Sequence, residues 1–366
     1  MGTYKIAKGA WALKIGKHEI TRDGAPFIIA EIGANHNGDL NLAKKLIDAA
    51  LEAGASCVKF QSWTKNTIFS REVYDNDKFL SDGRDETRTE DLEDVVEKYS
   101  LSKRELTELS AYASGKEIVF SCSGFSFDEV DFLVDDLKIP FIKIASMDIP
   151  NLPFLEYIGA KGVPVILSTG LASMEEIKEA VDTLTNAGVV DLALLHCIAN
   201  YPPDDVDSNL LNIRMFEKNF PSVLIGFSDH SIGTAIPLAA IALGARVIEK
   251  HFTLNKDMEG WDHAISADQS DLLTIVSEGR RISAALGSKE RKVTEKDLEM
   301  RVAFRRSIVA SRFIKAGKVF ERADIDFKRP GRGIPPNQLN TVIGRTAIRD
   351  IIADAIIEED DFEKKS

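Results

Sequence analysis

Two of the chain's six histidines, His230 and His251, each end a short apolar run that is typical of a β-strand. The runs read "LIGFSDH" and "VIEKHFT", and they are consecutive along the chain. If the two strands are neighbours, both imidazoles can reach one point, and imidazole suits Zn, Mn, Co or Fe. No third protein ligand is evident, which is typical of an open catalytic site. The alternative is a pair of buried histidines with purely structural hydrogen bonds.

Two lysines lie inside apolar runs, Lys59 in "CVKFQS" and Lys143 in "FIKIAS". Burying an ammonium group is costly unless it meets an anion. Hydroxyl groups at nearby run ends can donate hydrogen bonds to such an anion: Ser146, Ser168 and Ser228. This pattern predicts a pocket for a phosphate or carboxylate, preferably on a doubly charged ligand. The alternative is that each lysine pairs with an inward acid such as Glu31.

Eight strand-like runs alternate with amphipathic segments such as 41–55 and 173–189, whose apolar residues return every three or four positions. The runs are 27–33, 57–62, 117–123, 141–146, 164–170, 192–197, 224–230 and 247–253. This count and size predict a (β/α)8 TIM barrel. An open doubly wound sheet is the alternative, and the absence of a glycine-rich phosphate fingerprint argues against it.

The ends of the predicted strands carry the polar residues, whereas their starts are apolar. Active sites of TIM barrels lie at these carboxyl ends. The polar end residues are Glu31, Lys59, Gln61, Ser121, Ser123, Lys143, Ser146, Ser168, Thr169, His196, Ser228, Asp229, His230, Glu249, Lys250 and His251. A metal there could polarise a carbonyl while lysines hold a phosphate. That chemistry fits an aldol-type condensation or cleavage of a phosphorylated carbon acid.

The chain outside the eight units suggests three further features. Within residues 1–26, "KIGKHEITRDGAPF" predicts a hairpin with an Asp-Gly turn that closes the barrel bottom. Residues 64–100 predict a mobile loop over the mouth followed by a helix, or else a disordered surface insertion. We expect a barrel domain over 1–287, a linker over 288–300, and a small β-rich domain over 301–366 that ends in a charged, solvated tail.

The composition excludes several classes of protein. A net charge of −12 argues against nucleic acid or an anionic membrane as a partner. No apolar stretch is long enough to span a membrane, and no secretory signal is apparent, so a cytoplasmic protein is expected. Cys57, Cys122 and Cys197 form no CxxC pair, which indicates reduced core residues, with a nucleophilic cysteine as the alternative.

Seven segments, in this order and spacing, resemble the sialic acid synthase family: "IAEIGANHNG", "VKFQ", "KIAS", "LSTG", "GFSDHS", "EKHFTL" and "DHAISAD". "RRSIVA" and "KRPGRGIPP" resemble the antifreeze-like SAF domain that follows the barrel in these enzymes. The resemblance covers about residues 25–350. It implies condensation of phosphoenolpyruvate with an N-acylated hexosamine-type sugar to give a nine-carbon α-keto acid.

The resemblance also implies roles for individual residues. His230 and His251 match two metal ligands, usually for Mn²⁺, with Mg²⁺ or Co²⁺ as possibilities. Phosphoenolpyruvate contacts match Lys59, Ser123, Lys143, Ser146, Ser168 and Ser228. The sugar side matches Glu31, Gln61, Tyr201, Asp262 and Arg329. The groups expected to take part in catalysis are Glu31, Lys59, Lys143 and Asp262.

Within that set, Arg329 of "KRPG" matches an arginine that the SAF domain offers to the partner subunit's active site. This implies a domain-swapped homodimer. Glu31 is expected to assist proton transfer, although it could instead position the sugar or pair with a lysine.

Two other functions remain open on the sequence. One is a related phosphoenolpyruvate-condensing barrel that makes eight-carbon or seven-carbon sugar acids, and the SAF-like segment argues against it. The other is a non-catalytic sugar-binding homologue, against which the intact histidines and lysines speak. The sugar also remains open between N-acetylmannosamine and a 2,4-diacetamido-trideoxyhexose.

Overall fold

The computed structural model describes residues 12–76, 91–288 and 290–363. The chain divides into two compact units, Met1–Gly287 and Ser288–Ser366. Among the described residues, no helix combines the length and the apolar character needed to cross a membrane.

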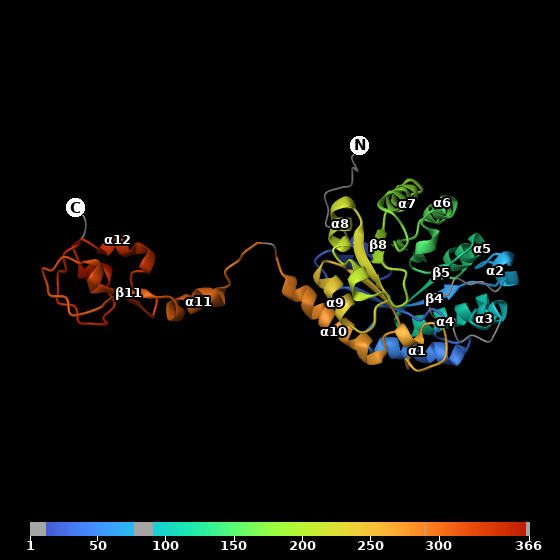
Figure 1. The fold of residues 1–366 in the computed structure, drawn as a ribbon, viewed down its shortest axis with the longest axis horizontal. Helices are drawn as coiled ribbons and strands as arrows, with labels where there is room; N and C mark the ends of the chain where they lie inside the picture. Colours follow the sequence, from blue (N-terminus) through green and yellow to red (C-terminus); the bar gives the residue numbers. More distant parts are fainter. Residues whose placement is uncertain (1–11, 77–90, 289, 364–366) are drawn as a thin grey trace. The chain divides into compact units, whose positions relative to one another are not determined.

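The first unit is a closed barrel of eight parallel strands, which confirms the predicted TIM barrel (Figure 1). The strands are β3 (Phe27–Glu31), β4 (Cys57–Ser62), β5 (Val119–Gly124), β6 (Ile142–Ile144), β7 (Val165–Ser168), β8 (Leu192–Cys197), β9 (Leu224–Asp229) and β10 (Val247–His251). They follow one another around the barrel, and β10 closes it against β3. The predicted neighbourhood of the two histidine-bearing strands is therefore correct.

Helices surround the strands in Figure 1. They are α1 (Leu40–Glu52), α4 (Lys103–Gly115), α5 (Phe127–Asp131, continued as a π-helix over Phe132–Asp136), α6 (Leu152–Ala160), α7 (Met174–Asn186), α8 (Asn212–Asn219), α9 (Ala235–Ala242) and α10 (Gln269–Leu286). Local sequence sets several of their starts. Ser102 and Ser173 each form a capping box with the glutamate three residues later, which satisfies exposed N–H groups at the beginning of α4 and α7.

A hairpin of β1 (Ala12–Ile15) and β2 (His18–Thr21) precedes the barrel, and its apolar side chains pack into the layer formed by the strand starts. Its turn lies at Gly16 and Lys17, so the predicted Asp-Gly turn was misplaced. Gly16 has a φ of +55°, a conformation that favours glycine. The Asp-Gly pair instead forms the turn that leads from β2 towards β3, where the Gly24 N–H donates to the Thr21 carbonyl.

The segment after β4 carries two short helices, α2 (Arg71–Asn76) and α3 (Leu92–Lys98). Its described parts bury an apolar cluster around Trp63, Tyr74 and Val96, so these parts are packed rather than a disordered insertion. Residues 77–90, on which the expected mobile loop falls, lie outside the described residues.

The second unit contains α11 (Glu295–Phe304), the antiparallel pair β11 (Ser307–Ala310) and β12 (Ile325–Lys328), and α12 (Leu339–Val342). It has its own apolar core. Helix α11 begins at Glu295, within the predicted linker. The expected solvated tail is correct for Glu358, Glu359 and Asp360, which are exposed, but wrong for Asp361 and Phe362, which are buried. The Asp361 side chain is buried because it pairs with Arg349 and accepts from the Glu358 N–H.

Candidate active site

Twelve of the thirteen predicted site residues line one cavity of about 430 Å³ at the carboxyl ends of the strands. They are Glu31, Lys59, Gln61, Ser123, Lys143, Ser146, Ser168, Tyr201, Ser228, His230, His251 and Asp262. They converge because alternate residues of a strand share a face. On the inner face, the residues at the strand starts are apolar, and the residues at the strand ends form this polar set. The thirteenth residue, Arg329, belongs to the second unit, where its guanidinium lies over the Phe304 ring.

Lys59 and Glu31 form a buried ion pair, with Nζ 2.7 Å from Oε2. Gln61 donates to the other Glu31 oxygen at 2.6 Å, and Lys59 also donates to Ser123 at 3.3 Å. Burial raises the pKa of Glu31 to about 7, although Lys59 acts in the opposite direction. The alternative expected from the sequence was that a lysine pairs with an inward acid. This is found for Lys59, and the pair lies in the cavity. A carboxyl group that titrates near neutrality can exchange protons.

Glu249 is a cavity residue to which the sequence reasoning assigned no role. Its carboxylate lies 3.8 Å from the Lys59 ammonium and 3.7 Å from that of Lys143, and it accepts from Ser228 at 3.0 Å. Burial favours its neutral form, but Lys143 and Lys59 outweigh burial and lower its pKa to about 2. Spacing could have revealed it, because Glu249 lies two residues before His251 on the same strand and so shares its face.

The lysine side of the cavity keeps unused hydrogen-bonding capacity. The buried Ser168 hydroxyl has no hydrogen-bond partner, and neither has Glu249 Oε2. Burial lowers the pKa of Lys143, which donates to the Ile144 carbonyl at 3.0 Å. Buried polar groups normally find partners, so these open positions indicate a polar ligand. Two ammonium groups with hydroxyl donors nearby fit an anion.

The two histidines face the cavity with their ring centres 5.5 Å apart. His230 Nδ1 lies 2.7 Å from the Ile198 carbonyl, which can only accept, so Nδ1 carries a proton. Burial lowers the pKa of His230, but the neighbouring Cys197 thiol and the Ile198 carbonyl outweigh burial and raise it, so a metal ion at Nε2 would displace a proton whenever the ring is charged. Burial lowers the pKa of His251 to about 4, which keeps its imidazole neutral near pH 7. Its buried Nδ1 has no hydrogen-bond partner and lies 3.6 Å from Asp262 Oδ2.

A divalent metal requires a lone pair on each histidine ligand. His251 is neutral near pH 7, and His230 can offer Nε2 because its Nδ1 binds the Ile198 carbonyl, so the pair fits such an ion. Within the described ranges, no group of three or more histidine, cysteine, aspartate or glutamate residues is arranged to hold a metal. A metal bound here would therefore have only two histidine ligands and would leave positions for water or substrate, as expected for a catalytic ion.

Part of the cavity wall is apolar, which the sequence reasoning did not predict. Its members are Trp63, Ile68, Phe69, Phe125 and Trp261. The Trp63 ring lies 6.1 Å from both Phe125 and Trp261. These side chains come from the segments after β4, β5 and β10, so no single sequence motif could identify them as one wall.

Several other predicted polar or reactive groups are structural. His196 faces away from the cavity and contacts the Ser208 carbonyl at 2.8 Å. Cys57 and Cys122 are buried and free, and burial raises the pKa of both thiols, which fits core residues rather than nucleophiles. Cys197 is also buried, but it lines the cavity, with Sγ 4.0 Å from His230 Nδ1.

Comparison with known proteins gives consistent results over both units. An N,N'-diacetyllegionaminic acid synthase of Legionella pneumophila is 36% identical over 87% of this chain and 89% of its own length. The N-acetylneuraminate-9-phosphate synthase of Mus musculus is 32% identical over 99% and 97%. The crystal structure of N-acetylneuraminic acid synthetase from Leptospira borgpetersenii, in complex with citrate, matches with a TM-score of 0.71 and 33% identity, covering 79% of this chain and 95% of that one. Residues 46–291 match the NeuB family and residues 305–363 match the SAF domain, so the chain belongs to the NeuB family and carries a SAF domain.

Proposed function

We propose that this protein is a metal-dependent nonulosonic acid synthase that condenses phosphoenolpyruvate with an N-acylated amino sugar. The observation that carries the proposal is one cavity lined by two buried lysines, by the Ser168 hydroxyl, which has no hydrogen-bond partner, and by the imidazoles of His230 and His251. Family membership and relatives named as legionaminic, pseudaminic and N-acetylneuraminate-phosphate synthases support it.

The lysine side would bind phosphoenolpyruvate. Lys59 and Lys143 provide positive charge that is almost fully shielded from bulk water, so their attraction for a phosphate or carboxylate is strong. The surrounding hydroxyl groups would supply directional hydrogen bonds and fix the three-carbon unit: Ser123, Ser146, Ser168 and Ser228. C3 of phosphoenolpyruvate would then attack the sugar aldehyde carbon, water would add at C2, and phosphate would leave with cleavage of the C–O bond.

The histidine side would bind the sugar aldehyde. Held by His230 and His251, a divalent ion such as Mn²⁺, Mg²⁺ or Co²⁺ would supply Lewis-acid polarisation. Glu31, whose pKa burial raises to about 7, would hold or release a proton beside the reacting atoms. Asp262 lies close to His251 and would contact the sugar, together with Gln61 and Tyr201.

The cavity also bears on the choice of sugar. Among its described lining residues, Lys59 and Lys143 are the only lysines or arginines, and phosphoenolpyruvate would occupy both. The apolar part of the wall fits acetamido methyl groups and a 6-deoxy carbon better than a second phosphate. We therefore propose an unphosphorylated N-acyl sugar, with a 2,4-diacetamido-trideoxyhexose preferred over N-acetylmannosamine.

Family resemblance further suggests a homodimer in which Arg329 reaches the partner's cavity. Helix α11 offers a further surface for contact with the partner subunit. None of its residues is buried, and several exposed ones are apolar: Leu298, Met300, Val302 and Phe304. Light scattering of the full chain should give twice the monomer mass, and a monomer would contradict the proposal.

Phosphate release from phosphoenolpyruvate, measured sugar by sugar with Mn²⁺, tests the function. We expect release with a di-N-acetylated 6-deoxy sugar, less with N-acetylmannosamine, and none with arabinose 5-phosphate. Chelator or His251→Ala should abolish it. Release with arabinose 5-phosphate alone would indicate an eight-carbon synthase. A folded, metal-loaded dimer that releases no phosphate with any sugar would favour the non-catalytic alternative.

A further inference from the structure

Asp229 and Lys250 form a second buried ion pair on β9 and β10, directly before the two histidines in the sequence. Lys250 Nζ lies 2.6 Å from Asp229 Oδ2. The side chains are 1% and 0% exposed, so water does not reach the pair. Neither residue lines the cavity. Because side chains alternate along a strand, the pair lies on the outer face of the barrel while the histidines face inward.

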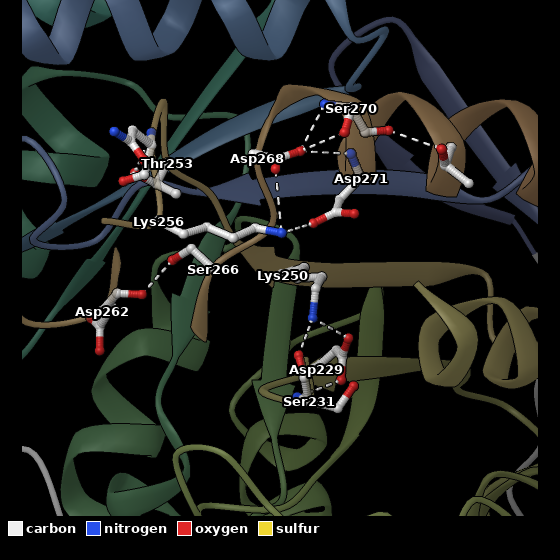
Figure 2. A network of polar contacts seen from close by, with 12 residues as sticks. Asp229, Ser231, Lys250, Thr253, Lys256, Asp262, Ser266, Asp268, Ser270 and Asp271 are labelled. Carbon is white, nitrogen blue, oxygen red and sulfur yellow. Dashed lines mark hydrogen bonds and ion pairs between the residues drawn. The ribbon is translucent and has the colours of Figure 1, made fainter. Parts of the chain in front are cut away.

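The ammonium group of Lys250 also links the chain on the far side of His230. It donates to the Ser231 carbonyl at 2.5 Å, and the Ser231 N–H donates to Asp229 Oδ1 at 2.9 Å. Figure 2 shows Asp229 and Ser231 beside the Lys250 nitrogen. The residues directly before and after His230 therefore both bind Lys250, the residue that precedes His251.

The backbone ladder between the two strands does not reach the histidines. Its last paired positions are Asp229 and Lys250. Beyond that pair, β10 continues only along β3, where His251 lies opposite Glu31. The Lys250 side chain therefore continues the connection between the two strands past the end of the ladder, to the backbone directly after His230.

A buried ion pair is weak evidence for stability, because desolvating two charges offsets much of their attraction. Its best-attested use is to fix one geometry among alternatives. We infer that the Asp229–Lys250–Ser231 contacts form a positioning clamp that holds the two imidazoles at the separation a metal ion requires. This inference rests on the proposed metal site. Residues behind metal ligands typically alter affinity by about 10–100-fold when changed.

The double variant Asp229→Asn/Lys250→Met tests the clamp without leaving one charge buried alone. The readouts are Mn²⁺ affinity, from electron paramagnetic resonance of the free ion, and the melting temperature of the metal-free protein. We expect Mn²⁺ affinity to fall about tenfold or more. Arg246→Met is the matched control. Arg246 is buried just before β10 and donates to the carbonyls of Arg22, Ala245 and Ile241, so its loss should lower the melting temperature but leave Mn²⁺ affinity unchanged.

A folded double variant with wild-type Mn²⁺ affinity would overturn the clamp. If the double variant does not fold, Lys250→Arg keeps the charge but changes the reach. An affinity equal to that of the wild type in this variant would likewise overturn the clamp, and a reduced one would support it. If the proposed metal site does not exist, the result is different: the wild-type protein binds no Mn²⁺, or the His251→Ala variant binds Mn²⁺ as tightly as the wild type does.

Discussion

The inner and outer faces of β9 and β10 use the same residue types in opposite ways. On the outer face, Asp229 is bound by Lys250 at 2.6 Å and by the Ser231 N–H at 2.9 Å. On the inner face, Glu249 lies 3.7 Å or more from its two lysines, and its Oε2 has no hydrogen-bond partner. The Asp229 carboxylate is saturated, meaning that both of its oxygens have partners, and it holds the backbone in place. The Glu249 carboxylate is not saturated, so the lysines beside it remain available to a ligand. We expect changes on the inner face to affect binding and catalysis, and changes at saturated carboxylates to affect geometry or stability.

The largest effect is expected from removing an inner cation. Lys143→Met should lower kcat/KM for phosphoenolpyruvate about 1000-fold, because a buried positive charge that stabilises an anion in a water-excluded site has no substitute. Steady-state phosphate release measures it. Lys161→Met is the control, since Lys161 pairs with Asp131 and Asp135 away from the cavity, and its activity should stay within about twofold. Equal losses in both variants would contradict the role assigned to the Lys143 charge in the cavity.

A somewhat smaller effect is expected from the neutral substitution Glu31→Gln. General acid–base groups contribute about 100-fold or more, so kcat should fall by at least that factor. Glu31 has its pKa raised to about 7, and it therefore ionises as the pH rises through 7. If the carboxylate is the active form, wild-type kcat should rise through this range and Glu31→Gln should lack that rise. If kcat of Glu31→Gln still rises through pH 7, the rise belongs to the ionisation of another group.

Glu249→Gln should change binding as a function of pH rather than abolish it. The negative charge of Glu249 raises the pKa of Lys59 and opposes the lowering of the pKa of Lys143 by burial. Without that charge both lysines lose their protons at lower pH. Phosphoenolpyruvate affinity, measured by calorimetry, should be close to wild type at pH 7 and about tenfold weaker at pH 9. A uniform loss at both values would mean that Glu249 touches the ligand directly.

The smallest effect is expected at a saturated carboxylate of the second unit. Asp324 is fully buried and is bound by Lys318, by Arg312 and by the Glu321 N–H. Burial opposes its ionisation, but these partners prevail and lower its pKa to about 2. The ionised group therefore stabilises the fold above its unfolded pKa near 4, and this stabilisation is lost as the pH falls through 2. Asp324→Asn should lower the melting temperature by about 5 °C at pH 7, and the difference should shrink near pH 2.

Much of the architecture was predictable because the local signals agree. Apolar strand starts, polar strand ends and amphipathic helices all indicate the same barrel, and the structure confirms it. The hairpin turn was misplaced because Asp23-Gly24 and Gly16-Lys17 both permit tight turns, and only the pairing of Ile15 with His18 distinguishes them. The apolar wall was missed because its residues come from loops whose path depends on long-range packing.

The sequence by itself determined which residues could act, since the order of eight strands places His230, His251, Lys59 and Lys143 at one end of any such barrel. It did not determine how each strand is rotated about its axis. In "SDH" and "EKH", alternation places the first and third residues on one face and the middle residue on the other, but it does not say which face lines the cavity. Tertiary packing decided that Glu249 faces the lysines and Lys250 faces Asp229, because the helices cover one face of every strand. The same packing excludes water, and burial is what raises the pKa of Glu31 and keeps His251 neutral.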